Sequence, residues 1–143
     1  MADKANDQWV QNGTRIKAWF VMLRDVMSSG KMSVQVGHGT DYIHMHGAEN
    51  PHYADWMNAD VGNRRKIVLG VKTRAELDKI ATDCEAAGMT CSLIVDAGLT
   101  EFNGVATVTG LVIYPHPDNA VPSSLKRAQA WKDIWLTKSV SVA

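Results

Sequence analysis

The chain has 143 residues, of which 45% are hydrophobic and 21% are charged, and its 15 Lys and Arg residues balance its 15 Asp and Glu residues. This length and composition fit one globular domain with its own core and exclude a fibrous or disordered class. A neutral chain has no overall positive field to attract nucleic acid, so RNA binding would need a local basic patch. No run approaches the ~18 apolar residues of a membrane span, and the polar N-terminus lacks a signal-peptide core. We therefore expect a cytoplasmic protein with no membrane partner.

The first half of the chain predicts one strand and two helices. Residues 1–14 are polar and are predicted to form a flexible leader. The continuous apolar run over residues 16–26 predicts a strand that is buried on both faces. The Ser-Ser-Gly turn at 28–30 has capping chemistry, and residues 31–46 then carry apolar groups at helical spacing. An Asn-Pro pair favours a short second helix over residues 50–60.

The second half predicts three strands and two helices. Residues 65–71 are apolar and predict a strand. Residues 73–87 open with a Thr-x-x-Glu capping box and end at a glycine, which predicts a helix. Residues 91–95 and 107–114 predict two further strands, and residues 121–137 predict a last helix.

The order β-α-α-β-α-β-β-α indicates an α/β fold: a single compact domain with a mixed four-stranded sheet flanked by helices. We expect this domain to span residues 15–138 and a short tail to follow over residues 139–143. The last helix would carry an apolar stripe that covers the sheet or contacts a second subunit, formed by Leu125, Ala128, Trp131 and Trp135.

Lys31 follows a glycine turn at a predicted helix N-terminus, where backbone N–H groups and the lysine charge can bind a phosphate or a developing oxyanion. The alternative is a solvated lysine in a first helical turn. Gln35 and His38 recur at helical spacing on the same face, so polar groups of long reach line one side of the helix. His38 could transfer a proton or contact a nucleotide, whereas a histidine that is hydrogen-bonded inside the fold is the simpler interpretation.

Asp96 comes directly after a predicted buried strand, where a carboxylate can face a cleft as a general base or an orienting group. An Asx turn that caps the loop is an equally good interpretation of the same residue. Thr100 and Thr107 flank that loop and could orient a water or hold a substrate carbonyl. Threonines in such segments are more often simple strand formers.

Three histidines, His44, His46 and His52, raise the alternative of a metal-dependent hydrolase. Their spacing matches no recognised zinc pattern, and no Asp, Glu or Cys arrangement completes it. We therefore expect no metal and no cofactor. The sequence also lacks the GxSxG motif of serine hydrolases, a P-loop and a GxGxxG motif.

Three separated motifs together resemble one known family. They are GKMSVQVGHG from Gly30, RKIVLGV from Arg65, and LIVDAGLT ending at Thr100, with Gly104 and Thr107 following. They are similar, in order and with compatible spacing, to the GKxAAQxxHA, KKIVLKV and DAGxT…GxxT motifs of the archaeal/eukaryotic type of peptidyl-tRNA hydrolase.

The resemblance implies a single α/β domain, often dimeric, so a homodimer is an expected assembly. It implies an enzyme that hydrolyses the ester between a peptide and the 3′ ribose of tRNA without a metal, so peptidyl-tRNA is the expected partner. It makes Lys31 and Asp96 the catalytic lysine and aspartate, with Thr100 and Thr107 completing the catalytic site. The residues expected to contact the substrate are Gly30, Gln35, His38 and Gly98.

Basic residues that this family usually carries near its site are absent here. The turn reads Met-Ser-Ser-Gly-Lys in place of the usual MxKGK, and Val95 and Leu99 stand where arginines are common. Each lost cation weakens contact with a phosphate backbone. The alternative function is therefore a weakly active or inactive member of the fold that binds RNA or a protein.

Overall fold

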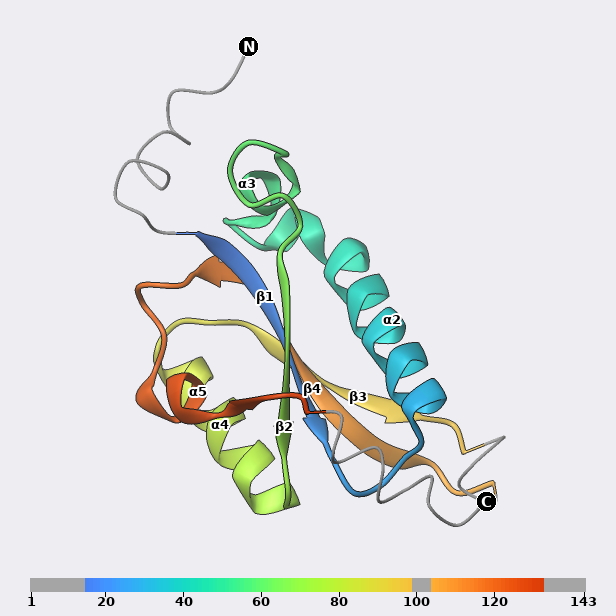
Figure 1. Cartoon of the computed structure of the whole chain (residues 1–143). Coiled ribbons are helices and arrows are strands. Elements are labelled where there is room, and N and C mark those ends of the chain that lie inside the picture. Colours follow the sequence, from blue (N-terminus) through green and yellow to red (C-terminus); the bar gives the residue numbers. More distant parts are fainter. Residues whose placement is uncertain (1–14, 99–103, 133–143) are drawn as a thin grey trace.

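A mixed five-stranded sheet with helices on both faces forms the framework of the protein (Figure 1). The computed structural model describes residues 15–98 and 104–132. The predicted leader over residues 1–14 and tail over residues 139–143 lie outside this part of the chain, as does Thr100.

The elements follow one another in nearly the predicted order. The strands are β1 (Ile16–Leu23), β2 (Lys66–Val71), β3 (Cys91–Asp96), β4 (Thr107–Pro117) and β5 (Gln129–Ala130). The helices are α2 (Ser29–Met45), the 3-10 helix η1 (Gly47–Glu49), α3 (Tyr53–Met57), α4 (Arg74–Ala86) and α5 (Ser123–Arg127). In the part of the chain that the structure describes, none of the helices combines the length and the apolar character that a membrane span requires.

The strand order is β3-β4-β1-β2-β5, which places β1 at the centre of the sheet. β1 and β2 are parallel, whereas β4 is antiparallel to both β1 and β3, and β5 is antiparallel to β2. Strands β1, β2 and β3 therefore run in the same direction. Their carboxyl ends, at Leu23, Val71 and Asp96, reach the same edge of the sheet, where ligand sites of open α/β sheets usually form.

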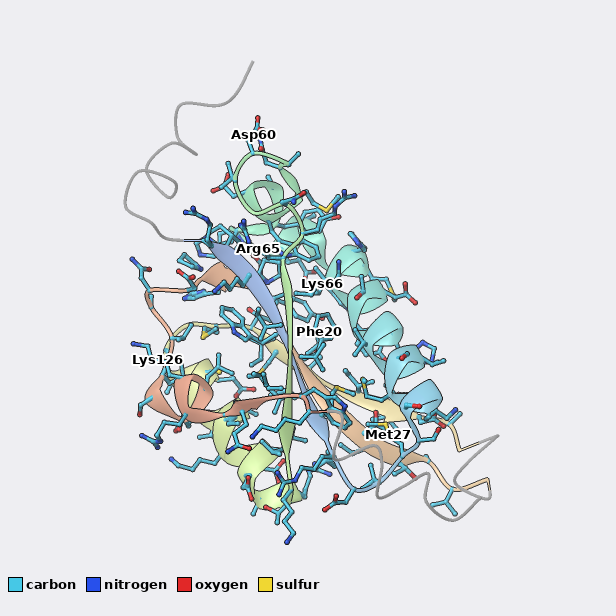
Figure 2. The ribbon with its side chains drawn as sticks, in the orientation of Figure 1. Phe20, Met27, Asp60, Arg65, Lys66 and Lys126 are labelled. Carbon is cyan, nitrogen blue, oxygen red and sulfur yellow. The ribbon has the colours of Figure 1, made fainter. Side chains whose placement is uncertain are left out.

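The central strand β1 is buried on both faces, as its continuous apolar sequence predicts. Alternate residues enter two separate cores. Trp19 and Val21 join the core beneath α4 and α5, and Phe20 and Met22 join the core beneath α2. Figure 2 shows Phe20 between the sheet and α2.

Side-chain caps fix the start of both long helices, as the sequence predicts. The Ser28 hydroxyl accepts a hydrogen bond from the backbone N–H of Lys31 (3.2 Å) and begins α2. The Thr73 hydroxyl accepts from the backbone N–H of Glu76 (3.1 Å) and begins α4. These bonds satisfy N–H groups that the first turn of a helix leaves without a partner.

The predicted four-stranded sheet and last helix are wrong at the C-terminal end. The helix α5 ends at Arg127, and β5 adds a fifth strand by pairing with Leu69 and Gly70 of β2. The exposed edge of β2 offers unpaired backbone groups that an extended segment can satisfy. Leu125 packs in the core beneath α4 and α5 (the α4-side core), whereas Trp131 packs against the core beneath α2 (the α2-side core). The two residues therefore do not form one stripe. Trp135 lies outside the described residues.

Strand β4 continues through Pro117, beyond the expected end at residue 114. Its register against β1 shifts between Lys17 and Trp19, so one additional residue of β4 is accommodated near Pro115. A bulge tolerates a proline because the ladder hydrogen bond is already interrupted there.

Two glycines of α2 give a matched test of the packing between this helix and β1. A Cβ atom on Gly39 would lie 2.8 Å from Cε1 of the buried Phe20, whereas a Cβ on Gly37 would have no neighbour within 4 Å. Gly37→Ala should raise the free energy of unfolding by about 0.5–1 kcal/mol through helix propensity. The free energy of unfolding of Gly39→Ala should be about 1–3 kcal/mol lower than that of Gly37→Ala, because the added Cβ overpacks the core. Chemical denaturation of both variants measures the difference, and equal effects would contradict the described packing.

Candidate active site

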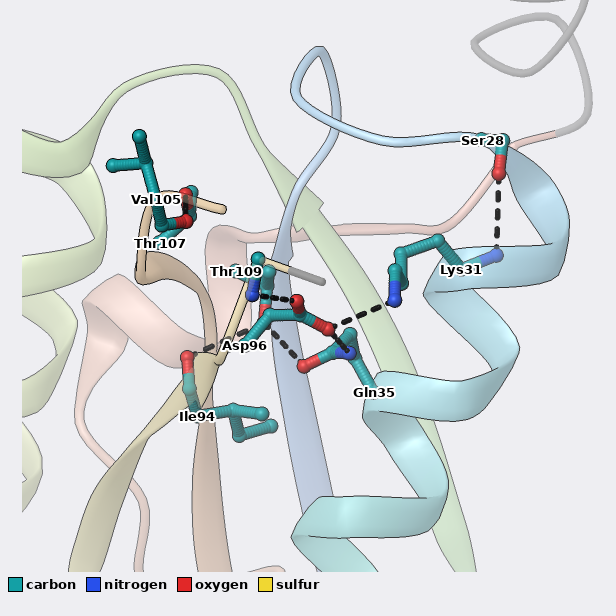
Figure 3. A network of polar contacts seen from close by, with 9 residues as sticks. Ser28, Lys31, Gln35, Ile94, Asp96, Val105, Thr107 and Thr109 are labelled. Atoms are coloured by element: carbon teal, nitrogen blue, oxygen red, sulfur yellow. Dashed lines mark hydrogen bonds and ion pairs between the residues drawn. The ribbon is translucent and has the colours of Figure 1, made fainter. Parts of the chain in front are cut away.

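Lys31 and Asp96 form an ion pair at the carboxyl edge of the sheet (Figure 3). Lys31 lies in the first turn of α2, and Asp96 is the last residue of β3. The distance from Lys31 Nζ to Asp96 Oδ2 is 3.0 Å, and the two side chains are only 12% and 7% exposed. Removing either partner leaves the other charge nearly buried and uncompensated, which is strongly unfavourable. The two residues that the family resemblance assigns to one catalytic site are therefore in contact.

Three donors hold the Asp96 carboxylate. Oδ1 accepts from the backbone N–H of Gly98 (2.6 Å), and Oδ2 accepts from Lys31 and from Gln35 Nε2 (2.6 Å). The Gly98 hydrogen bond is the main cause of a lowered pKa of Asp96, and Lys31 and Gln35 lower this pKa further while burial opposes them. Asp96 is therefore a carboxylate at neutral pH. The loop-capping bond to Gly98 and a chemical role are compatible, because Lys31 and Gln35 engage the other oxygen.

The backbone at Gly98 explains why this position needs glycine. Its φ is +83°, and a Cβ atom there would collide with the carbonyl oxygen of Val105. The close approach of the two loop segments is fixed by a hydrogen bond from the Gly104 N–H to the Gly98 carbonyl (2.6 Å). The loop can thus aim the Gly98 N–H at Asp96 only without a side chain.

A buried polar chain extends from Asp96 into the protein. Gln35 is completely buried in α2, and its Oε1 accepts from the hydroxyl of Thr109 (2.9 Å). Thr109 is also completely buried, and the backbone carbonyl of Ile94 lies 3.2 Å from its Oγ1 as a second, longer acceptor for the same hydroxyl proton. Because a carboxylate can only accept, the Gln35 amide must direct its N–H to Asp96 and its oxygen to Thr109. The chain Thr109–Gln35–Asp96–Lys31 is continuous.

The sequence interpretation missed Thr109. Regular alternation along β4 would direct its side chain away from α2, because Leu111 and Ile113 belong to the α4-side core. The pairing with β3 shifts by one residue, however: Ile94 pairs with Gly110 and Val95 pairs with Val108. Thr109 is the additional residue of this β-bulge, and a bulge redirects a side chain. A single threonine in an apolar strand gives little sign of such a register shift.

The other predicted residues lie at different distances from this chemistry. Thr107 pairs with Asp96 across β3 and β4, and its hydroxyl donates to the Val105 carbonyl (2.9 Å). Gly30 is exposed in the first turn of α2, where a Cβ would have no neighbour within 4 Å. His38 is exposed on α2 and Thr100 lies outside the described residues.

The three histidines of the metal hypothesis have separate partners. His44 Nδ1 lies 2.7 Å from the Tyr53 hydroxyl, His46 stacks on Tyr114, and His52 meets another histidine ring edge-on. In the part of the chain that the structure describes, no three His, Cys, Asp or Glu residues come together as a metal site. The ligand set that this hypothesis needs is not assembled from His44, His46 and His52.

The arrangement can support attack on a carbonyl carbon. The Lys31 ammonium has three N–H donors, and its bond to Asp96 uses one of them. The remaining donors can stabilise negative charge that develops on a carbonyl oxygen. The Asp96 carboxylate can orient a water molecule, and the open surface at Gly30 lets a substrate approach the helix N-terminus.

Comparison with known proteins identifies one family. Residues 16–129 match the family model described as peptidyl-tRNA hydrolase PTH2. The chain is 34% identical to a peptidyl-tRNA hydrolase of Thermococcus sibiricus over 97 residues, which cover 66% of this chain and 79% of the relative. It is 32% identical to that of Thermococcus onnurineus over 110 residues (75% and 90%) and 31% identical to that of Saccharolobus solfataricus over 112 residues (76% and 92%). The resemblance seen in the three motifs is confirmed.

The lowered pKa of Asp96 predicts how the ion pair contributes to stability with pH. A carboxyl whose pKa is lower in the folded than in the unfolded chain stabilises the fold above the unfolded pKa, about 3.9 for Asp. That contribution disappears as the pH falls through the folded pKa. Asp96→Asn should therefore lower the free energy of unfolding by about 3 kcal/mol at pH 7, because it breaks a nearly buried pair. In urea denaturation between pH 7 and pH 3, the difference in free energy of unfolding between wild type and Asp96→Asn should shrink below pH 4. A difference that stays constant would contradict the lowered pKa of Asp96.

Proposed function

The chain belongs to the peptidyl-tRNA hydrolase family PTH2 and is a peptidyl-tRNA hydrolase, and we propose that the buried cluster around Lys31 and Asp96 is its catalytic centre. The reaction hydrolyses the ester between a peptide and the 3′ ribose of tRNA and releases free tRNA. The main support for this location of the catalytic centre is the 3.0 Å ion pair of Lys31 with Asp96. The pair lies within the residues that match the family model and at the carboxyl edge of the sheet.

In the proposed mechanism, Asp96 orients a water molecule toward the ester carbonyl carbon. Its lowered pKa makes it a weak base in the resting site, so the water proton moves to it only as the new C–O bond forms. The N–H groups of Lys31 stabilise the resulting oxyanion. The bond to the ribose 3′ oxygen then breaks, and that oxygen takes up the proton.

Other residues of the proposed site have supporting roles. The open surface at Gly30 and the exposed His38 on α2 would contact substrate, and Gly98 and Gln35 hold Asp96 in place. Thr107 lies beside Asp96 in the strand register, which supports its role as a hydroxyl that orients the water. Thr100 keeps the same proposed role on the strength of the sequence motif.

The alternative of an inactive binding module is not favoured. A nearly buried ion pair costs desolvation energy, and an apolar pair of similar size is often at least as stable. A module that no longer catalyses hydrolysis has no evident need for Lys31 and Asp96. Their presence with Gln35 in one hydrogen-bonded cluster supports retained activity.

The cellular setting and assembly belong to the same proposal. We place the enzyme in the cytoplasm, where translation produces peptidyl-tRNA. We expect a homodimer, and the partly exposed Leu93 (38%) and Val95 (46%) on the edge strand β3 support it, because apolar edge strands favour association. A monomeric mass in light scattering at micromolar concentration would contradict the dimer.

The catalytic assignment predicts a contrast between two ion pairs. Lys79 and Asp83 on α4 form a matched pair at 3.1 Å, but their side chains are 65% and 30% exposed. Lys31→Ala and Asp96→Asn should each lower kcat/KM for an N-blocked aminoacyl-tRNA by about 100-fold or more, as removal of transition-state groups does. Lys79→Ala and Asp83→Asn should stay within about twofold of wild type, because exposed pairs contribute little.

The assay follows release of the labelled N-blocked amino acid, with folding of each variant checked by circular dichroism. Full turnover by folded Lys31→Ala or Asp96→Asn would remove that residue from the catalytic centre. A folded wild-type protein that releases nothing at low salt would overturn the function itself.

A further inference from the structure

We infer that Thr109 is a positioning residue of the hydrolase, whose hydroxyl holds the Gln35 amide so that its N–H points at the Asp96 carboxylate. The inference rests on the proposed catalytic role of Asp96. It extends the site by a residue that neither touches substrate nor stands in the three sequence motifs.

The observed orientation of the Gln35 amide gives its nitrogen an acceptor and its oxygen a donor. Gln35 and Thr109 are both completely buried, so water cannot replace a missing partner. Gln35 Nε2 donates to Asp96 Oδ2 at 2.6 Å, and Gln35 Oε1 then requires a donor. The Thr109 hydroxyl supplies it at 2.9 Å.

Removal of the hydroxyl leaves the amide with no good orientation. In the observed orientation, Oε1 of Gln35 becomes a buried acceptor without a donor. In the reversed orientation, Oε1 faces the negative carboxylate of Asp96, and the amide N–H₂ loses its acceptor. Either outcome weakens the hydrogen bond that Asp96 accepts from Gln35 and disturbs the position of the Asp96 carboxylate beside Lys31.

The position of Thr109 in the bulge allows its hydroxyl to be tested by substitution. Thr109 is the extra residue between Val108 and Gly110, which both pair with β3. Its side chain meets β3 at the Ile94 carbonyl, 3.2 Å from Oγ1. Valine has the same β-branched shape as threonine, so Thr109→Val removes the contacts of the hydroxyl to Gln35 and Ile94 while the shape of the side chain is kept.

The electrostatic surroundings of Asp96 simplify the readout. Among the described residues, Asp96 contacts the charged Lys31 and the neutral Gln35 of α2, and the neutral Thr107 of β4 pairs with it in the sheet. A shift in the titration of Asp96 after substitution of Thr109 therefore reports the loss of the Gln35 hydrogen bond. The pKa of Asp96 should rise, since Gln35 contributes to lowering it.

The experiment measures kcat and KM for an N-blocked aminoacyl-tRNA across pH in three variants. Thr109→Val should lower kcat about 10- to 100-fold with KM nearly unchanged, as loss of precise orientation does. It should also move the acidic limb of the kcat profile to higher pH. Thr109→Ser keeps the hydroxyl, so its kcat and the pH of its acidic limb should both match those of wild type. Thr40→Val removes a hydroxyl that donates to the Val36 carbonyl on α2 (2.9 Å) and controls for a general loss of stability.

Two results would overturn the inference: a kcat of Thr109→Val within twofold of wild type, or equal impairment of Thr109→Ser and Thr109→Val. If Thr109→Val does not fold, Thr109→Ala gives the same readouts without a buried branched side chain. An inactive wild type would overturn the proposed function instead. In that case NMR titration of the Asp96 carboxyl still decides the inference, because an identical pKa in wild type and Thr109→Val would contradict it.

Discussion

The nearly buried ion pair of Lys31 and Asp96 determines how the other polar groups of the site are arranged. Two charges in this position are stable only with good geometry and additional hydrogen bonds. The protein supplies them through the Gly98 N–H and the Gln35 amide, and Thr109 completes the chain. This requirement explains why so many polar groups of the α2-side core converge on one carboxylate.

The sheet topology brings the two charges together. Because β1 and β3 run in the same direction, the loop that begins α2 and the loop that follows β3 leave the same edge. The Ser28 cap fixes the first turn of α2, so Lys31 starts its reach toward Asp96 from a defined backbone position. The bulge in β4 then directs Thr109 toward α2, where a regular strand would place it in the opposite core. The bulge thus places the Thr109 hydroxyl within hydrogen-bond distance of Gln35.

The sequence predicted the parts of this account that depend on local patterns. The buried strand, the capped helices and the convergence of Lys31 with Asp96 follow from periodicity, capping chemistry and the family motifs. Thr109 and β5 could not be predicted in this way, because both depend on pairing between distant segments. One residue of register against β3 decides which face Thr109 occupies, and the free edge of β2 decides that the chain after Arg127 extends.

A double-mutant cycle on Lys31 and Asp96 tests whether the two residues act as one catalytic unit. The measurement is kcat/KM for an N-blocked aminoacyl-tRNA in Lys31→Ala, Asp96→Asn and the double variant. Groups that act as one catalytic unit are strongly non-additive, so the double variant should be no more than several-fold slower than the slower single variant. Losses that multiply would show that the two residues act independently, and they would contradict a single catalytic centre built on this ion pair.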